Sequence, residues 1–142
     1  VLQGWDLEDY FAHFEMFESA GVDLRAEPLV GVGSVCRRQA TAEIEYIMKC
    51  LHAKGIRIHG FGVKTNGLKR YAQYLFSADS LAWSFGARYN QARCSNHQIE
   101  YTAKNCANCI LYALEWREKV ISNWDFQINN PIEKVKENQI CN

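Results

Sequence analysis

The sequence predicts an α/β fold, and more specifically the C-terminal half of a (β/α)8 TIM-like barrel with an appended metal-binding segment. Short apolar runs alternate with amphipathic helices at intervals of roughly 25 residues, as in consecutive parallel βα units. Polar or glycine-rich residues recur where these strands should end, and in a barrel such ends face one active site. A doubly wound sheet is the alternative that the same alternation allows.

The βα units are expected within residues 1–90. Strands are expected near residues 1–3, 28–33, 56–62 and 76–84. A first helix follows Asp6, which is suited to the N-cap position, and ends at Gly21. Further helices are expected at residues 41–54, 66–76 and 109–121. The last of these belongs to a zinc-binding segment over residues 91–122, and we expect a loosely ordered tail over residues 123–142.

Four metal-ligand side chains follow the last predicted strand at tight spacing: Cys94, His97, Cys106 and Cys109. Two pairs of ligands, each separated by two residues, are typical of closed tetrahedral zinc sites. Such a site keeps no open position for water, so we expect a structural Zn²⁺. The alternatives are free cysteines with an incidental histidine, or a disulfide framework among the six cysteines.

The balance of charge gives little sign of a basic surface. Lys and Arg together number 16, as do Asp and Glu, so the formal net charge is zero. An overall nucleic-acid footprint is therefore absent, although local basic patches remain. No apolar run is long enough for a transmembrane helix, and no secretory signal is recognisable, so we expect a cytoplasmic protein without membrane association.

Four strands form only half of an eight-stranded barrel. A half barrel exposes two unpaired sheet edges, which would make it prone to aggregation. We therefore expect a first half-barrel that is missing from this sequence or supplied by another chain.

The strand ends and the segment after them resemble the tRNA-guanine transglycosylase superfamily as far as about Lys119. They look most like its DNA-directed branch, the deazapurine DNA-modification transglycosylases. The likeness lies in Gln3-Gly4, the glycine-rich Gly31–Val35, His59–Val63, and Asp79 followed nine residues later by Arg88. The resemblance implies exchange of a guanine base for a 7-deazaguanine in DNA.

The resemblance also implies a role for each strand end. Asp79 stands where the family has its nucleophile, which would form a covalent intermediate at C1′. Gln3 would read the base edge, and His59 would contact the base or orient Asp79. Backbone groups near the base would come from Gly31, Gly33, Gly60 and Gly62. The alternatives are a turn-capping aspartate, an ordinary strand-end glutamine, turn glycines and a core histidine.

Attack at C1′ requires a base that has left the stack, so contacts to a DNA strand are expected. The candidates for phosphate contacts are Arg37, Arg38, Lys64 and Arg88, and Trp83 is a candidate for stacking on a base. The alternatives are solvent-exposed basic residues and a tryptophan that fills the core.

Two departures from the family pattern favour DNA over tRNA as the substrate. The tRNA enzymes carry Pro-Thr-Arg after the nucleophile, whereas this chain has Trp83-Ser84-Phe85. The family's distant zinc-binding histidine is replaced by His97, which lies within the cluster. The family's second catalytic aspartate would belong to the first half-barrel.

Other functions remain open at this stage. The chain is alternatively a non-catalytic, zinc-stabilised nucleic-acid-binding module or an inactive fragment. Base exchange in tRNA and a metal-dependent barrel hydrolase are further alternatives.

Overall fold

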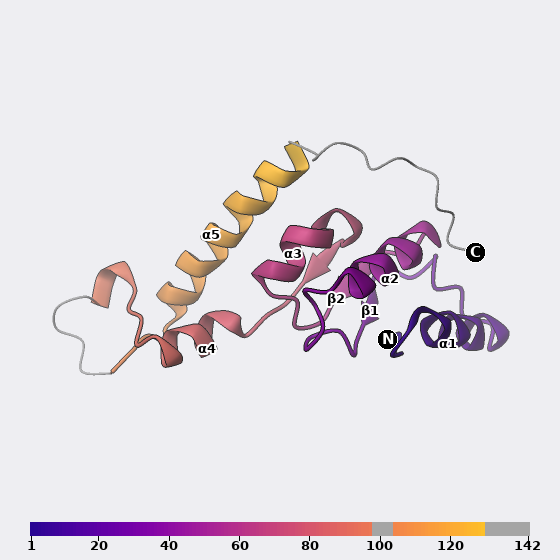
Figure 1. Ribbon diagram of the computed structural model, residues 1–142, viewed down its shortest axis with the longest axis horizontal. Coiled ribbons are helices and arrows are strands. Elements are labelled where there is room, and N and C mark those ends of the chain that lie inside the picture. Colours follow the sequence, from indigo (N-terminus) through magenta and orange to yellow (C-terminus); the bar gives the residue numbers. More distant parts are fainter. Residues whose placement is uncertain (98–103, 130–142) are drawn as a thin grey trace. The chain divides into compact units, whose positions relative to one another are not determined.

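The computed structural model describes residues 1–97 and 104–129, with side chains as far as residue 122. The chain forms two compact units, of which the first includes Val1–Asp79 and the second begins at Ser80. The first unit contains a parallel sheet with its helices (Figure 1). The second contains further helices and the Cys/His cluster.

The sheet of the first unit has three parallel strands. They are β1 (Val30–Val32), β2 (Ile58–Gly60) and β3 (Ser77–Ala78), in that order across the sheet. Leu2 forms a parallel bridge with Val32, so the N-terminal segment lies beside β1. The spatial order therefore follows the order along the chain, as expected for consecutive βα units.

The helices of the first unit are α1 (Leu7–Ser19), α2 (Ala42–Ala53), α3 (Thr65–Tyr71) and the 3₁₀ turn η1 (Ala72–Tyr74). Side-chain caps fix two of their starts. The Asp6 carboxylate accepts a hydrogen bond from the Asp9 amide at 3.0 Å, and the Thr41 hydroxyl accepts one from the Ile44 amide at 3.3 Å. Gly21 lies just beyond α1 with a φ of +82°, a conformation that favours glycine.

The hydrophobic core of the first unit lies between the sheet and its helices. Helix α2 contacts β2 and α3 (Figure 1). The largest fully buried side chains are Leu2, Tyr10, Phe14, Val32, Val35, Ile44, Ile47, Met48, Leu51, Ile58, Val63 and Tyr71. These residues come from α1, β1, α2, β2, α3 and the segments next to them, so packing of this core positions the loops that follow β1 and β2.

The second unit comprises α4 (Ala82–Tyr89), the 3₁₀ turn η2 (Ser95–His97) and α5 (Ile110–Asn129). Helix α4 begins at residue 82, inside the range 76–84 in which a strand was expected, and no helix was expected there. Leu81, Phe85 and Tyr89 recur at helical spacing, and a short apolar run does not separate a strand from a helix.

Helix α5 extends beyond the expected end at residue 121. Residues 123–129 are helical and not loosely ordered, whereas residues 130–142 of the expected tail lie outside the described residues. No glycine or proline occurs from Ile110 to Asn129, so the sequence contains nothing that would stop the helix earlier.

The α/β class and the parallel sheet are confirmed, whereas the half-barrel stays a prediction. Among the described residues, none of the helices is both long and apolar enough to cross a membrane.

Candidate functional site

The carboxyl ends of the parallel segments meet at one edge of the sheet. Gln3 follows the Leu2 bridge, Gly33 follows β1, Phe61 follows β2 and Asp79 follows β3. Parallel strands place the residues that follow them on the same side of a sheet, which is where α/β proteins bind their ligands. Residues expected to bind or attack the substrate therefore belong to adjacent loops of the first unit.

The Gln3 amide is held against the loop after β1. A Cβ atom at Gly33 would lie 2.5 Å from Gln3 Nε2, so only glycine leaves room for this side chain. The Ser34 hydroxyl donates a hydrogen bond to Gln3 Oε1 at 2.5 Å, and Ser34 has a φ of +61°. A non-glycine residue in this region is uncommon, which indicates a loop shaped around the Gln3 amide.

Tyr10 holds the same loop through a buried hydrogen bond. Its hydroxyl donates a hydrogen bond to the Gly33 carbonyl at 2.6 Å, and its side chain is fully buried. Burial raises the pKa of Tyr10 to about 12, so the phenol keeps its proton and remains a donor. The carbonyl of Gly33 is thereby fixed beside Gln3.

Two of the predicted base-binding glycines allow close packing within the protein. A Cβ atom at Gly31 would lie 2.5 Å from Phe61 Cε2, and one at Gly60 would lie 2.7 Å from Val63 Cγ2. Gly62 differs, because its φ is +65° and its amide points at a carboxylate. The need for glycine at Gly31 and Gly60 is therefore explained by neighbouring side chains.

Asp79 interacts with the loop after β2. Its Oδ1 atom accepts a hydrogen bond from the Gly62 amide at 2.7 Å, while the side chain remains 62% exposed. His59 Nε2 lies 3.9 Å from the same oxygen, and His59 Nδ1 lies 2.9 Å from the Ser77 hydroxyl. The predicted residues His59, Gly62 and Asp79 are thus brought together, with the carboxylate open to solvent.

The five predicted nucleic-acid contacts have different surroundings. Arg37 and Lys64 are exposed, whereas Arg38 is mostly enclosed and pairs with Glu43 at 3.1 Å. Half-buried Trp83 and exposed Arg88 belong to α4 in the second unit. Their roles stay predictions.

A concave surface that encloses a volume of about 730 Å³ lies beside Gln3 in the first unit. Its lining includes Trp5, His13, Ser34 and Arg37. Trp5 was not among the predicted site residues, although an aromatic residue directly after Gln3-Gly4 was a signal in the sequence.

Gln39 is a second residue that the sequence did not point to. Its buried Oε1 accepts hydrogen bonds from the amides of Lys64 at 2.9 Å and Gly67 at 3.0 Å. It therefore caps α3 from a distant loop, and no local pattern predicts a cap that is distant in sequence.

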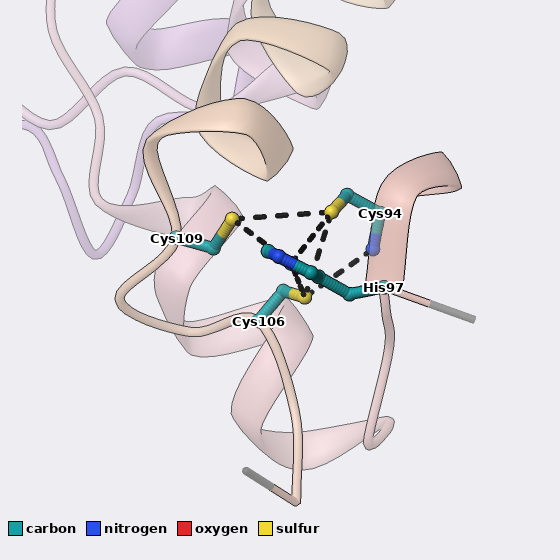
Figure 2. A group of neighbouring side chains, drawn as sticks. All are labelled: Cys94, His97, Cys106 and Cys109. Carbon is teal, nitrogen blue, oxygen red and sulfur yellow. Dashed lines mark hydrogen bonds between the residues drawn. The ribbon is translucent and has the colours of Figure 1, made fainter. Parts of the chain in front are cut away.

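The predicted metal ligands of the second unit lie together (Figure 2). The Nδ1 atom of His97 is 3.1, 3.6 and 3.5 Å from the sulfur atoms of Cys94, Cys106 and Cys109, respectively. Cys94 Sγ is 3.8 Å from Cys106 Sγ and 3.9 Å from Cys109 Sγ. Zn–S bonds of about 2.3 Å at a tetrahedral centre require sulfur atoms about 3.8 Å apart. Three thiols and one imidazole therefore fit a metal ion such as zinc.

Two tight turns present these ligands. The His97 amide donates to the Cys94 carbonyl, and the Cys109 amide donates to the Cys106 carbonyl, each at 3.1 Å. A hydrogen bond from the Tyr112 amide lowers the pKa of the Cys109 thiol, whereas burial raises the pKa of the Cys94 thiol. A bound cation would stabilise all three thiolates.

Glu115 of α5 holds the first of these turns. Its carboxylate accepts a hydrogen bond from the Ser95 amide at 3.0 Å and another from the Ser95 hydroxyl. These hydrogen bonds, the one from the hydroxyl first, lower the pKa of Glu115. The carboxylate thus links α5 to the residue next to the ligand Cys94.

A family model described as DpdA, DeoxyPurine in DNA protein A, matches residues 1–136 of this chain. No curated protein and no solved structure matches this chain. The matched region includes the strand-end loops and all four Cys/His ligands. The chain therefore belongs to the DpdA family, the deazapurine DNA-modification transglycosylases.

Proposed function

We propose that this chain catalyses the exchange of a guanine base in DNA for a 7-deazaguanine through a covalent intermediate on Asp79. The observation that carries the proposal is the arrangement of Gln3, Gly62 and Asp79 after parallel segments of one sheet, at their carboxyl ends. An exposed carboxylate and a held amide on one sheet edge provide a nucleophile and a base-reading group.

The proposed reaction has two displacements at C1′. In the first, Oδ2 of Asp79 attacks C1′, the C1′–N9 bond breaks, and its electron pair leaves with guanine, which takes up a proton. In the second, the nitrogen of the incoming base attacks C1′, that base loses a proton, and the bond from C1′ to Asp79 breaks. The Gly62 amide already engages Oδ1, which supports Oδ2 as the attacking atom.

The residues around Asp79 and the strand ends bind and orient the substrate. Gln3 reads the base edge, and backbone groups at or next to Gly31, Gly33, Gly60 and Gly62 lie along the base. His59 orients Asp79, since it lies between Ser77 and that carboxylate. Arg37, Arg38, Lys64 and Arg88 contact DNA phosphates, and Trp83 stacks on a base.

We further propose that the parallel sheet is the C-terminal half of a (β/α)8 barrel. Four parallel segments in chain order, starting with Leu2, support this. The general acid and base for the leaving and entering bases would come from a first half-barrel. The Cys/His cluster would hold a structural Zn²⁺, because four protein ligands leave no open position.

A base-exchange assay tests this function. The chain is incubated with DNA and labelled guanine or labelled 7-deazaguanine, with and without a first half-barrel, and label in the DNA is counted. Incorporation should disappear in Asp79→Ala and persist in Asp23→Ala, which alters another exposed aspartate of the first unit. Omission of the incoming base should leave DNA attached to Asp79, which mass spectrometry detects.

The alternatives have distinct outcomes in the same assay. DNA binding without incorporation under all conditions would favour a non-catalytic binding module. Incorporation into tRNA but not DNA would favour the tRNA-directed reaction.

A further inference from the structure

Trp5 forms an exposed aromatic platform at the edge of the concave surface beside Gln3. Its side chain is 64% exposed, and the guanidinium carbon of Arg38 lies 3.9 Å from the ring centroid. The Arg38 guanidinium therefore lies against the indole ring, most of which remains exposed.

The platform is fixed in place before any ligand binds. The Trp5 amide donates to Asp9 Oδ2 at 2.9 Å, and the Trp5 carbonyl accepts from Arg38 Nη2 at 2.6 Å. Arg38 Nη1 donates to Glu43 at 3.1 Å, and its side chain is only 13% exposed. The Trp5 backbone is held by hydrogen bonds, and its ring is packed against Arg38. The side chain therefore loses little conformational freedom when a partner stacks on it.

The concave surface next to Trp5 has the chemistry of a nucleotide site. It offers the Gln3 amide, the Ser34 hydroxyl, the His13 imidazole and the exposed guanidinium of Arg37. Its volume of about 730 Å³ lies within the usual range for small-ligand sites. An aromatic face beside cationic groups is the arrangement that binds single-stranded nucleic acid, with bases on the ring and phosphates on the cations.

We infer that Trp5 stacks on an unpaired nucleobase of the DNA strand that flanks the exchanged nucleotide. Arg37 contacts a phosphate of the same strand. The proposed function assigns the exchanged guanine to Gln3 and Asp79, so we assign the base on Trp5 to a neighbouring nucleotide of the same strand. The inference rests on the proposed function for the choice of DNA and for the identity of the attacked nucleotide.

Binding of labelled single-stranded DNA, measured by fluorescence anisotropy over a range of salt concentrations, tests the platform. Trp5→Ala should weaken binding about tenfold or more, and Trp5→Phe should restore most of it. The salt dependence should stay unchanged in Trp5→Ala, because no cation is removed. The backbone contacts of Trp5 persist in both variants, so neither should unfold the chain.

Phe76→Ala provides a matched control. Phe76 is also 64% exposed and has the Arg57 guanidinium 5.5 Å from its ring centroid, but it lies before β3, on the opposite edge of the sheet. Its removal should leave DNA binding unchanged. Equal losses in Trp5→Ala and Phe76→Ala, or no loss in Trp5→Ala, would overturn the inference. Tighter Trp5-dependent binding of RNA than of DNA would overturn the choice of DNA.

An oligonucleotide with 2-aminopurine beside the target guanine tests which base stacks. Its fluorescence should be quenched by the wild-type chain and by Asp79→Ala, and not by Trp5→Ala. Quenching only when 2-aminopurine replaces the target guanine would overturn the flanking position. These measurements need no turnover, so failure of base exchange with Trp5-dependent binding intact would refute the proposed function alone. Exchange that proceeds without any Trp5 effect on binding would refute this inference alone.

Discussion

The Gly62 amide donates a hydrogen bond to Asp79 Oδ1 at 2.7 Å, which joins the loop after β2 to the end of β3. Gly62 has a φ of +65°, a backbone conformation that favours glycine. The contact orients an otherwise exposed side chain and leaves its second oxygen facing away from this donor. In the proposed reaction, that geometry determines which oxygen attacks.

Gly62→Ala should therefore impair base exchange more than it impairs folding. The substitution forces a left-handed conformation on alanine, which costs roughly 1 kcal/mol, and places a Cβ atom 2.9 Å from Cys36 Cβ. We expect a modest fall in melting temperature and a loss of exchange of at least tenfold. Gly21→Ala has the same backbone strain at φ +82° in open space, so it should lower stability and leave the exchange rate unchanged. Equal activity of the two variants would contradict a role for the Gly62 amide.

Tyr10→Phe should destabilise the first unit, because the buried Gly33 carbonyl loses its hydroxyl donor. The expected cost is about 1–3 kcal/mol, measured as the free energy of unfolding in urea. Tyr46→Phe, at an exposed tyrosine of α2, should cost much less. A loss in Tyr10→Phe no larger than in this control would contradict the anchoring role.

The raised pKa of Tyr10 predicts that the first unit loses stability at alkaline pH. Burial raises its folded-state pKa from 10.0 to about 12, so folding favours the protonated phenol. Its stabilising contribution is complete below about pH 10 and is lost as the pH rises towards about 12. Unfolding free energies measured across this interval should fall more steeply for the wild type than for Tyr10→Phe. Burial also raises the pKa of Tyr71, so part of the alkaline loss should persist in the variant.

Cys106→Ser should remove the bound metal and unfold the Cys/His segment of the second unit. Loss of one thiolate from a set of four ligands removes much of the folding free energy that a structural zinc supplies. Metal analysis of the purified chain and its helix content by circular dichroism are the readouts. Cys36→Ser alters an exposed free thiol outside the cluster and should retain the metal. Undiminished zinc in Cys106→Ser would exclude this donor set.

Glu115→Ala should weaken metal retention without removing a ligand. The carboxylate holds the amide of Ser95, next to Cys94, and groups that orient ligands typically change metal affinity tenfold or more. Competition with a chelator measures the change. Glu118→Ala, on the same helix but paired with Arg117, serves as the control and should bind zinc like the wild type.

Short sequence patterns predicted most of the features that depend on residues close together in the chain. The cap Asp6, the parallel strand order and the cluster of Cys94, His97, Cys106 and Cys109 follow from spacing and residue type. The Gln39 cap of α3 and the Tyr10 anchor of Gly33 depend on contacts between distant segments, which no local pattern contains. The start of α4 was missed because its apolar residues also suited a short strand.

The three residues of β2 lie between β1 and β3 in the sheet. Substrate-reading groups at Gln3 and Gly33 lie on one flank, and Asp79 lies on the other. A shift of β2 would therefore change the distance between the proposed base-reading residues and Asp79. A displacement of about 1 Å can cost an enzyme roughly a hundredfold in rate. In directed evolution, variation should therefore be tolerated least at Ile58, His59 and Gly60, even in variants that still fold.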